Sequence, residues 1–273
     1  MSVGIVAQLD NPRAAALAEE VHAALASVGI EARIDESTAT SLGIEGIPVE
    51  HMNATDLVVS IGGDGTFLFA ARSISETPII GVNLGEVGFL TTIAPASAAE
   101  VIPAVYKELA SGEHTVQRLP RLTARFDERT LGPALNEVIV HAPQRGRPGG
   151  IVGEVRVDGE TYLRDHMDGV MVATPTGSTA YNLSEDGPLL VPAIDGLVVN
   201  VMCGRDAMPP LVVPLEAEIS IGLSSAAHGY VIADGRERRE VDVPVKISIG
   251  SADDPVRVAG PRVEFFEGLG KLA

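Results

Sequence analysis

Three glycines around a single carboxylate form the stretch best suited to phosphate chemistry. Gly62-Gly63-Asp64-Gly65-Thr66 follows an apolar run, Leu57–Ile61, that we predict to be a buried strand, and a predicted helix comes next. Glycines let a phosphate approach the backbone, and the N–H groups of a helix N-terminus favour anions. Asp64 could accept a hydroxyl proton or hold Mg²⁺ that bridges phosphates. The alternative is a tight turn with Asp64 as the helix cap.

A second glycine-rich stretch, Gly81 to Thr91, follows the predicted strand Pro78–Val82. It does not match the G-x-G-x-x-G pattern, so a standard dinucleotide fingerprint is absent from it. Phe89, beside these glycines, could contact a base or pack in the core, and taken alone it favours the core.

The third stretch is a run rich in hydroxyl groups, Thr174 to Ser184, after the predicted strand Gly169–Ala173. Its many donors and acceptors suit ribose hydroxyls and a base edge. Ser178 does not lie in a G-x-S-x-G pattern and no histidine partner is evident, so we do not expect a serine nucleophile. The alternative is a Ser/Thr-rich turn that binds nothing.

Strands and helices alternate in the first part of the chain. Asn11-Pro12 is a helix-start signal, with Asn11 as N-cap, and Gly29 is a stop signal. The pattern predicts a parallel sheet with helices on its faces, a Rossmann-like α/β domain over residues 1–115. The other predicted elements here are strands Val3–Ala7 and Glu31–Ile34 and helices Thr66–Ser73 and Ala98–Ala110.

Short β-rich runs replace the helical periodicity further along. Asp158-Gly159 and Asp234-Gly235 are strong hairpin-turn signals between such runs. The fold class is therefore α/β with a C-terminal antiparallel β-sandwich domain over residues 116–254. The predicted strands are Leu122–Phe126, Glu137–Val140, Glu154–Val157, Gly169–Ala173, Leu197–Val201, Ile219–Leu223, Val231–Ala233 and Val245–Ile249.

Composition excludes several classes of protein. A formal net charge of −17 argues against nucleic-acid and anionic-membrane partners. Hydrophobic residues make up 45% of the 273, which is enough for a core. No apolar run could span a membrane and no signal peptide is evident, so we expect a cytoplasmic protein.

Metal and disulfide chemistry receive little support. One cysteine, Cys203, excludes a disulfide framework, and we expect it to be a small buried apolar residue. The six histidines lack metal-ligand spacing, so no resident metal site is predicted.

Taken together, the motifs resemble the NAD kinase family over most of the chain. Gly62 to Thr66, then Gly85 to Thr91, then Asn136-Glu137, then Asp168-Gly169 with Thr174 to Tyr181 occur in the family's order. Pro209–Pro214 and the closing Phe265 to Leu272 look like its later landmarks. The motif Gly-Gly-Asp-Gly-Thr is also found in lipid kinases and phosphofructokinases. The run Thr-Pro-Thr-Gly-Ser-Thr-Ala-Tyr is the motif that distinguishes the NAD kinase family from them.

The resemblance implies phosphorylation of the 2′-hydroxyl of the adenosine ribose of NAD, with ATP or polyphosphate as donor, to give NADP. It implies Mg²⁺, or another divalent cation, accompanying the donor, and a homodimer or homotetramer. It also implies that residues 255–273 return to the first domain. The alternatives are a non-catalytic dinucleotide-binding sensor and a related lipid or sugar kinase.

The resemblance also assigns roles to residues of this sequence. Asp64 matches the general base, and Gly65 would let the substrate lie against the loop. Phe89 matches a residue lining the NAD pocket, Asn136 and Glu137 a pair that hydrogen-bonds the dinucleotide, and Asp168 a carboxylate at the nicotinamide half. The matches to adenine and ribose contacts, several of them supplied across a subunit interface, are Thr176, Thr179, Ala180, Tyr181, Asn182, Leu183 and Ser184. His166 and Arg147 fall where the family often has a basic residue.

The sequence departs from the family pattern at three places. Glu185-Asp186-Gly187-Pro188 replaces a usual glycine pair before proline, Cys203–Pro210 lacks the usual Pro-His pair, and Arg236 stands where glutamine is common. These departures concern the nicotinamide end of the site and the binding of the donor. The acidic excess indicates a salt-rich cytoplasm, as in a halophilic archaeon, and predicts loss of activity or stability at low salt.

Overall fold

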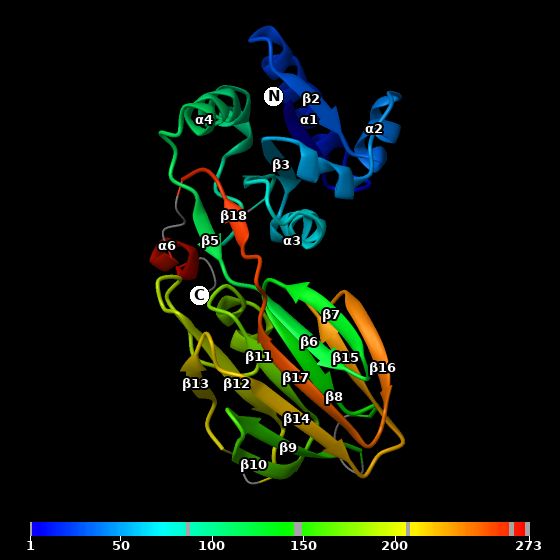
Figure 1. Ribbon diagram of the computed structural model, residues 1–273. Coiled ribbons are helices and arrows are strands. Elements are labelled where there is room, and N and C mark those ends of the chain that lie inside the picture. Colours follow the sequence, from blue (N-terminus) through cyan, green and yellow to red (C-terminus); the bar gives the residue numbers. More distant parts are fainter. Residues whose placement is uncertain (1, 86–87, 145–148, 206–207, 262–264, 271–273) are drawn as a thin grey trace. The chain divides into compact units, whose positions relative to one another are not determined.

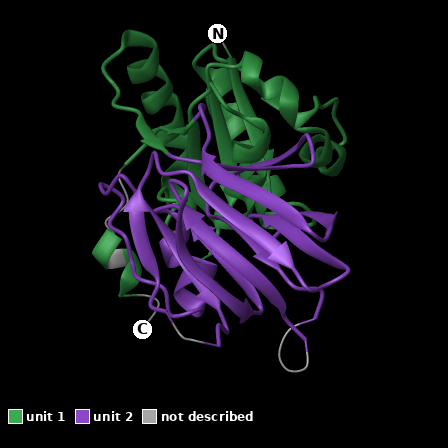
Figure 2. Cartoon of the chain, turned by 60° about the horizontal axis from the view of Figure 1, so that its bottom comes forward, with its two compact units in different colours: residues 1–119, 255–273 green, residues 120–254 purple. Residues whose placement is uncertain are grey.

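The computed structural model describes residues 2–85, 88–144, 149–205, 208–261 and 265–270, with the side chain of residue 267 outside the description. The chain forms two compact units, coloured separately in Figure 2. Unit 1 comprises residues 1–119 and 255–273, and unit 2 comprises residues 120–254. The division after residue 119 lies slightly beyond the predicted one because β5 (Gln117–Leu119) pairs with β18 (Val256–Val258).

Unit 1 is built on a six-stranded sheet in the order β2-β1-β3-β4-β18-β5. Strands β2, β1, β3 and β4 are parallel, as predicted. Every residue of β1, β3 and β4 is buried, as expected for a parallel sheet covered on both faces. These strands are β1 (Ser2–Ala7), β2 (Glu31–Ile34), β3 (Leu57–Gly62) and β4 (Ile79–Asn83).

Helix α1 (Pro12–Ser27) begins and ends at the predicted residues. Asn11 caps it by accepting hydrogen bonds from the amides of Arg13 and Ala14, and Gly29 follows the helix with a φ of 77°. The other helices are α2 (Glu36–Leu42), α3 (Asp64–Ser73), α4 (Ala98–Ser111) and α6 (Phe265–Leu269), with short 3₁₀ turns η1 (Val49–Ala54) and η2 (Pro95–Ser97) (Figure 1).

Unit 2 is an antiparallel sandwich of two six-stranded sheets, as predicted. One sheet has the order β10-β9-β14-β17-β6-β7 and the other β13-β12-β11-β8-β15-β16. The first contains β6 (Leu122–Phe126), β7 (Arg129–Ala134), β9 (Ile151–Val157), β10 (Glu160–Met167), β14 (Ile219–Ser224) and β17 (Val245–Ser251). The second contains β8 (Glu137–His141), β11 (Gly169–Ala173), β12 (Gly196–Met202), β13 (Leu211–Pro214), β15 (His228–Ala233) and β16 (Glu237–Asp242). Between β11 and β12 lie η3 (Gly177–Thr179) and α5 (Tyr181–Ser184).

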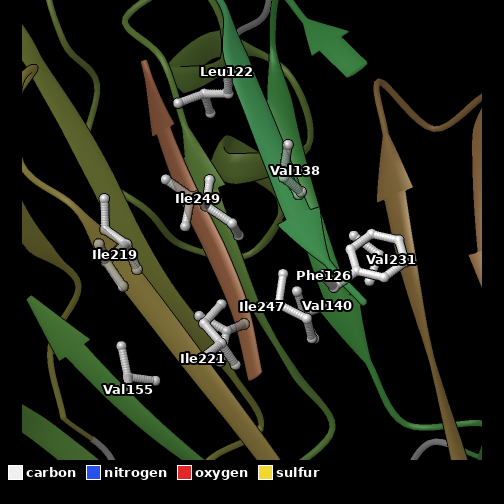
Figure 3. Packing of buried hydrophobic residues seen from close by; sticks show 14 of the residues in the cluster. Leu122, Phe126, Val138, Val140, Val155, Ile219, Ile221, Val231, Ile247 and Ile249 are labelled. Atoms are coloured by element: carbon white, nitrogen blue, oxygen red, sulfur yellow. The ribbon is translucent and has the colours of Figure 1, made fainter. Parts of the chain in front are cut away.

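Side chains from both sheets form the core of unit 2. Ile247 and Ile249 of one sheet and Val138 and Val140 of the other belong to one buried cluster (Figure 3). The β8–β11–β12 sheet is buried on its second face too, where Tyr181 packs against a smaller cluster that contains Ile139 and Met171. This second face carries the hydroxyl-rich loop that follows β11.

Both predicted Asp-Gly hairpins are present. Asp158 and Gly159 join β9 to β10 with φ values of 50° and 84°, and Asp234 and Gly235 join β15 to β16 with φ values of 48° and 63°. Two successive positive φ values are the type I′ pattern, which matches the twist of antiparallel strands.

Cys203 differs from its predicted environment. It is exposed and has a φ of 51°, directly after β12, where a turn ends the strand. Apolar character alone did not reveal that the strand stops at Met202. Among the helices of the described residues, none is long and apolar enough to span a membrane.

A buried arginine joins the two ends of unit 2. Arg121 is 1% exposed, its Nε donates to the carbonyl oxygen of Asp254 at 2.7 Å, and its guanidinium lies 2.5 Å from the Asp254 carboxylate. Removing the carboxylate takes a charged hydrogen-bond partner from a buried cation.

We therefore predict that Asp254→Ala lowers the free energy of unfolding by about 1.5 kcal/mol, since hydrogen bonds to charged groups contribute on that order. The control is Glu31→Ala, which removes the partner of Arg33 in a pair exposed on both sides and should cost about 0.5 kcal/mol or less. Denaturant titrations at one fixed salt concentration measure both, and equal effects would contradict the prediction.

Candidate active site

The glycine-rich loop joins β3 directly to α3. Gly63 is the residue before the helix, and because it has no side chain it makes no capping hydrogen bond. A Cβ atom at Gly62 would lie 2.3 Å from the hydroxyl of Thr66 and 3.1 Å from Cβ of Gln8. The first turn of α3 therefore packs so closely on the strand end that only glycine fits at position 62.

The Asp64 carboxylate is held by a second loop rather than by its own helix. Its Oδ2 accepts a hydrogen bond from the Phe89 amide at 2.9 Å. Its Oδ1 accepts one from the Leu90 amide at 3.1 Å and one from the Thr91 hydroxyl at 3.0 Å. The alternative that Asp64 caps α3 is not what the structure shows, because its side chain is directed to the segment after β4.

These bonds leave the carboxylate one open acceptor position. A carboxylate offers about four lone-pair sites, and three are used by the described residues, two on Oδ1 and one on Oδ2. Asp64 is only partly buried. The carboxylate is thus fixed in orientation while Oδ2 can still accept a proton or hydrogen bond from a ligand.

Gly88 permits this approach of the two loops. A Cβ atom at Gly88 would lie 2.1 Å from Asp64 Oδ1, a distance that no side chain allows. Gly65 is exposed in the first turn of α3, next to the carboxylate in sequence. Phe89 is half-buried, and its ring packs against Phe265 of α6 with centroids 6.1 Å apart. The core-type packing expected of Phe89 is therefore present on one side of its ring.

In unit 2, the segment that carries Asn136 and Glu137 is held by two other loops. The carboxylate of Asp234 accepts hydrogen bonds from the amides of Leu135, Asn136 and Glu137 at 2.9, 2.7 and 3.3 Å. The Thr174 hydroxyl donates to the Leu135 carbonyl at 2.6 Å, and the Thr174 amide donates to the Asn136 carbonyl at 2.9 Å. The backbone of this segment is therefore fixed without using the side chains of Asn136 or Glu137.

Glu137 is an acid without a partner for one of its oxygens. It is buried, and its Oε2 has no hydrogen-bond partner in the part of the chain that the structure describes. Burial, and secondarily the negative charge of Asp234, raise the pKa of Glu137 to about 8. At neutral pH the group is mostly protonated, so it can donate as well as accept a hydrogen bond.

The hydroxyl-rich loop packs directly on this segment. A Cβ atom at Gly177 would lie 2.0 Å from the carbonyl oxygen of Asn136. Ser178 is fully buried, donates to the Pro175 carbonyl at 2.7 Å and accepts from the Leu190 amide at 3.0 Å. Its hydroxyl is committed to the loop, which agrees with the expectation that it is no nucleophile.

The predicted ligand residues of this loop differ in accessibility. The half-buried ones are Thr176, Thr179, Ala180, Tyr181 and Leu183, and Ser184 is exposed. Asn182 is fully buried: its amide nitrogen donates to the Pro188 carbonyl at 3.1 Å, and its oxygen accepts from Asn200 at 3.3 Å. The side chain of Asn182, expected to contact substrate, instead holds the loop together.

His166 and Asp168 do not join this group. Strand β11 pairs with β8 so that Ala173 faces Glu137, whereas Gly169 faces His141. Asp168 precedes β11 and the hydroxyl-rich loop follows it, so the two lie at opposite ends of the strand, about 20 Å apart at about 3.3 Å per residue. His166 is exposed on β10, Asp168 is buried, and Arg147 lies outside the described residues.

Several residues with a role in this geometry were not identified from the sequence. Asp234 was interpreted only as a turn residue, and Thr91 and Phe265 were not assigned any function. The sequence does contain a signal for Asp234. A turn that needs only a positive φ could use Asn or Gly, so an Asp at this position suggests a role for its carboxylate. No group of three or more His, Cys, Asp or Glu side chains placed to hold a metal ion occurs among the described residues.

Comparisons with known proteins agree with the two units. Residues 3–110 match the family model of the ATP-NAD kinase N-terminal domain, and residues 135–259 match that of the ATP-NAD kinase C-terminal domain. The NAD kinase of Natronomonas pharaonis is 47% identical over 272 residues, which cover 100% of both chains.

Solved structures show the same fold. The crystal structure of an NAD kinase from Archaeoglobus fulgidus in complex with ATP is 27% identical, with a TM-score of 0.79 over 100% of this chain and 98% of that one. Yeast NADH kinase complexed with NADH has a TM-score of 0.88 at 22% identity, covering 100% of this chain and 87% of that one, and shows the fold alone. By both family models and by its close relative, the chain belongs to the NAD kinase family.

Proposed function

We propose that this NAD kinase family member transfers a phosphoryl group from ATP or polyphosphate to the 2′-hydroxyl of the adenosine ribose of NAD, giving NADP. The observation that carries the proposal is the Asp64 carboxylate, held by three donors with one acceptor position open. Family membership supports the substrate, and the ATP in the Archaeoglobus fulgidus structure supports a nucleotide donor.

Asp64 acts as the general base in this reaction. Its Oδ2 accepts the proton of the 2′-hydroxyl while the ribose oxygen forms a bond to the terminal phosphorus of the donor. The bond from that phosphorus to the bridging oxygen breaks, and the shortened donor leaves with the electron pair. General-base help of this kind is worth roughly 10²–10⁴-fold in rate. The N-terminus of α3 adds backbone N–H groups that favour the anionic phosphates.

Mg²⁺, or another divalent cation, enters with the donor in this proposal. Mg²⁺ is commonly bound through one or two carboxylates together with substrate phosphates, and it neutralises charge on those phosphates.

Unit 2 supplies the groups that suit the dinucleotide. Asn136 and the unpartnered acid of Glu137 offer hydrogen bonds to ribose hydroxyls, since their backbone is already held by Asp234 and Thr174. Thr176, Thr179 and Tyr181 are accessible on the adjoining loop. Their donors and acceptors suit the adenine edge and its ribose.

A homodimer or homotetramer is part of the proposal. Asp168 precedes β11, at the far end of that strand from the hydroxyl-rich loop, and His166 lies two residues earlier on β10. A second copy of the chain could bring its own Asp168 to a dinucleotide bound at that loop. Oligomerisation would thus bring together residues that lie apart in one protomer.

We also propose that the protein works in a cytoplasm rich in salt, which its net charge of −17 fits.

The first prediction from this proposal concerns Asp64→Asn. Purified protein should form NADP from NAD with Mg²⁺ and ATP or polyphosphate, tested with each donor across a range of salt. Asp64→Asn should lower kcat by about 10²-fold or more while NAD still binds, because the amide cannot accept the proton. Glu19→Gln, on the exposed side of α1, is the control. Full activity in Asp64→Asn would remove the proposed base, and NAD binding without turnover by the unaltered protein would indicate a sensor.

A second prediction uses the two glycines of the loop after β4. Gly88→Ala would place a methyl group 2.1 Å from the Asp64 carboxylate, so the carboxylate must move. A displacement near 1 Å can cost about 10²-fold in kcat. Gly85→Ala meets nothing closer than Asn83 Oδ1 at 3.9 Å and should leave kcat near normal. Thermal unfolding checks that both variants are folded. Similar kcat values for the two would then refute the idea that the loop after β4 holds the Asp64 carboxylate in position.

The raised pKa of Glu137 predicts a pH-dependent stability. The folded state keeps this proton while the unfolded chain, with the ordinary value of 4.5, has lost it, until the pH reaches about 8. The contribution of Glu137 to the free energy of unfolding is therefore fully present below about pH 4.5, and it declines as the pH rises to about 8.

Glu137→Gln should flatten that decline, since the amide does not titrate. Denaturant midpoints measured from about pH 5 to about pH 8.5 test it. The exposed Glu160→Gln should retain the slope of the unaltered protein. An unchanged slope in Glu137→Gln would show that the group is ionised in the folded protein.

A further inference from the structure

The last described helix of the chain contacts the loop that holds the catalytic base. Helix α6 (Phe265–Leu269) belongs to unit 1, although it lies at the opposite end of the sequence from that loop (red in Figure 1). Phe265 is 8% exposed, and its ring lies 6.1 Å from that of Phe89 at an angle of 55°. The attraction between tilted rings at this distance is stronger than the burial of their apolar surface alone would give.

Gly268, on the same face of the helix, also lies close against the Phe89 ring. A Cβ atom at Gly268 would lie 2.8 Å from Cε1 of Phe89 and 3.2 Å from its Cδ1 and Cζ atoms. Positions 265 and 268 are three apart and share one face of a helix. Phe266, between them, is 75% exposed. One face of α6 is therefore given to Phe89 and the other to solvent.

Phe89 passes this contact on through its backbone. Its amide donates to Asp64 Oδ2, and the next two residues supply the other two donors to the carboxylate. Leu90 and Thr91 are buried, so this short segment has little freedom to turn independently of Phe89. The hydroxyl of Thr92 also donates to the carbonyl of Pro261, a second tie to the C-terminal segment, at 3.4 Å.

We infer that α6 positions the Asp64 carboxylate, with Phe265 and Gly268 as positioning residues that act through Phe89. The inference rests on the proposed function, because it concerns the orientation of the proposed base. Helix α6 has only five residues and a helix so short is not stable alone, so its contact with Phe89 holds both partners in place. Loss of the contact lets the Phe89 amide, and with it the carboxylate, depart from its orientation.

The test compares neighbouring phenylalanines of one helix. Phe265→Ala should lower kcat about tenfold, a part of the cost of a misplaced group, with a smaller change in the affinity for NAD. Phe265→Leu, which restores most of the apolar contact, should recover much of the kcat. Phe266→Ala removes a ring that is 75% exposed and meets the Phe265 ring edge-on, with centroids 5.5 Å apart, so it should change kcat much less than Phe265→Ala. Gly268→Ala, which presses on the Phe89 ring, should lower kcat in the same way as Phe265→Ala.

A double variant separates positioning from general stability. In Asp64→Asn, which lacks the base, adding Phe265→Ala should not reduce the residual turnover further. A full tenfold loss in that background would overturn the inference, as would equal kcat values for Phe265→Ala and Phe266→Ala. Full activity of Asp64→Asn by itself would instead refute the proposed base. Thermal midpoints within the range of Phe266→Ala confirm that the variants are folded.

Discussion

The hydrogen bonding of the Asp64 carboxylate is the constraint on which the site in unit 1 depends. Its donors follow β4, while Asp64 itself follows β3, and the two strands are parallel neighbours. Their carboxyl ends therefore meet at one edge of the sheet, where ligands bind in open α/β sheets. Gly62 and Gly88 are needed because each lets backbone approach where a Cβ atom would collide. These glycines are therefore needed to position the Asp64 carboxylate, whether or not they also allow a phosphate to approach.

Unit 2 solves a related problem with a different set of contacts. A strand beginning next to a binding loop has amides and carbonyls that must be satisfied, and Asp234 and Thr174 satisfy those of residues 135–137. The side chain of Glu137 is then left buried with an oxygen that has no partner among the described residues. Such a group is costly unless a ligand or water completes it. Its presence beside an accessible hydroxyl-rich loop is typical of a binding site.

The sequence predicted elements well where one pattern dominated. Glu31–Ile34, Leu122–Phe126 and Gly169–Ala173 have the predicted bounds, and both Asp-Gly turns are hairpins. Strands β10 and β16 were not predicted because they carry many charged residues on exposed faces. The motifs identified Asp64 and the hydroxyl-rich loop. They could not reveal that loop 88–91 tethers Asp64, that Asp234 clamps Asn136, or that Asn182 is buried, because these depend on contacts distant in sequence or on burial.

The acidic charge of the chain restricts how such a site can bind anions. A protein with a net charge of −17 repels NAD and a phosphate donor at long range. Binding of such anions must therefore come from groups in direct contact, and the amides at the start of α3 and the hydroxyls of unit 2 are groups of the kind required. At 1 M salt the Debye length is about 3 Å, so distant repulsion is screened while a hydrogen bond of that length persists. A site built from short contacts keeps its affinity where one built on long-range attraction would lose it.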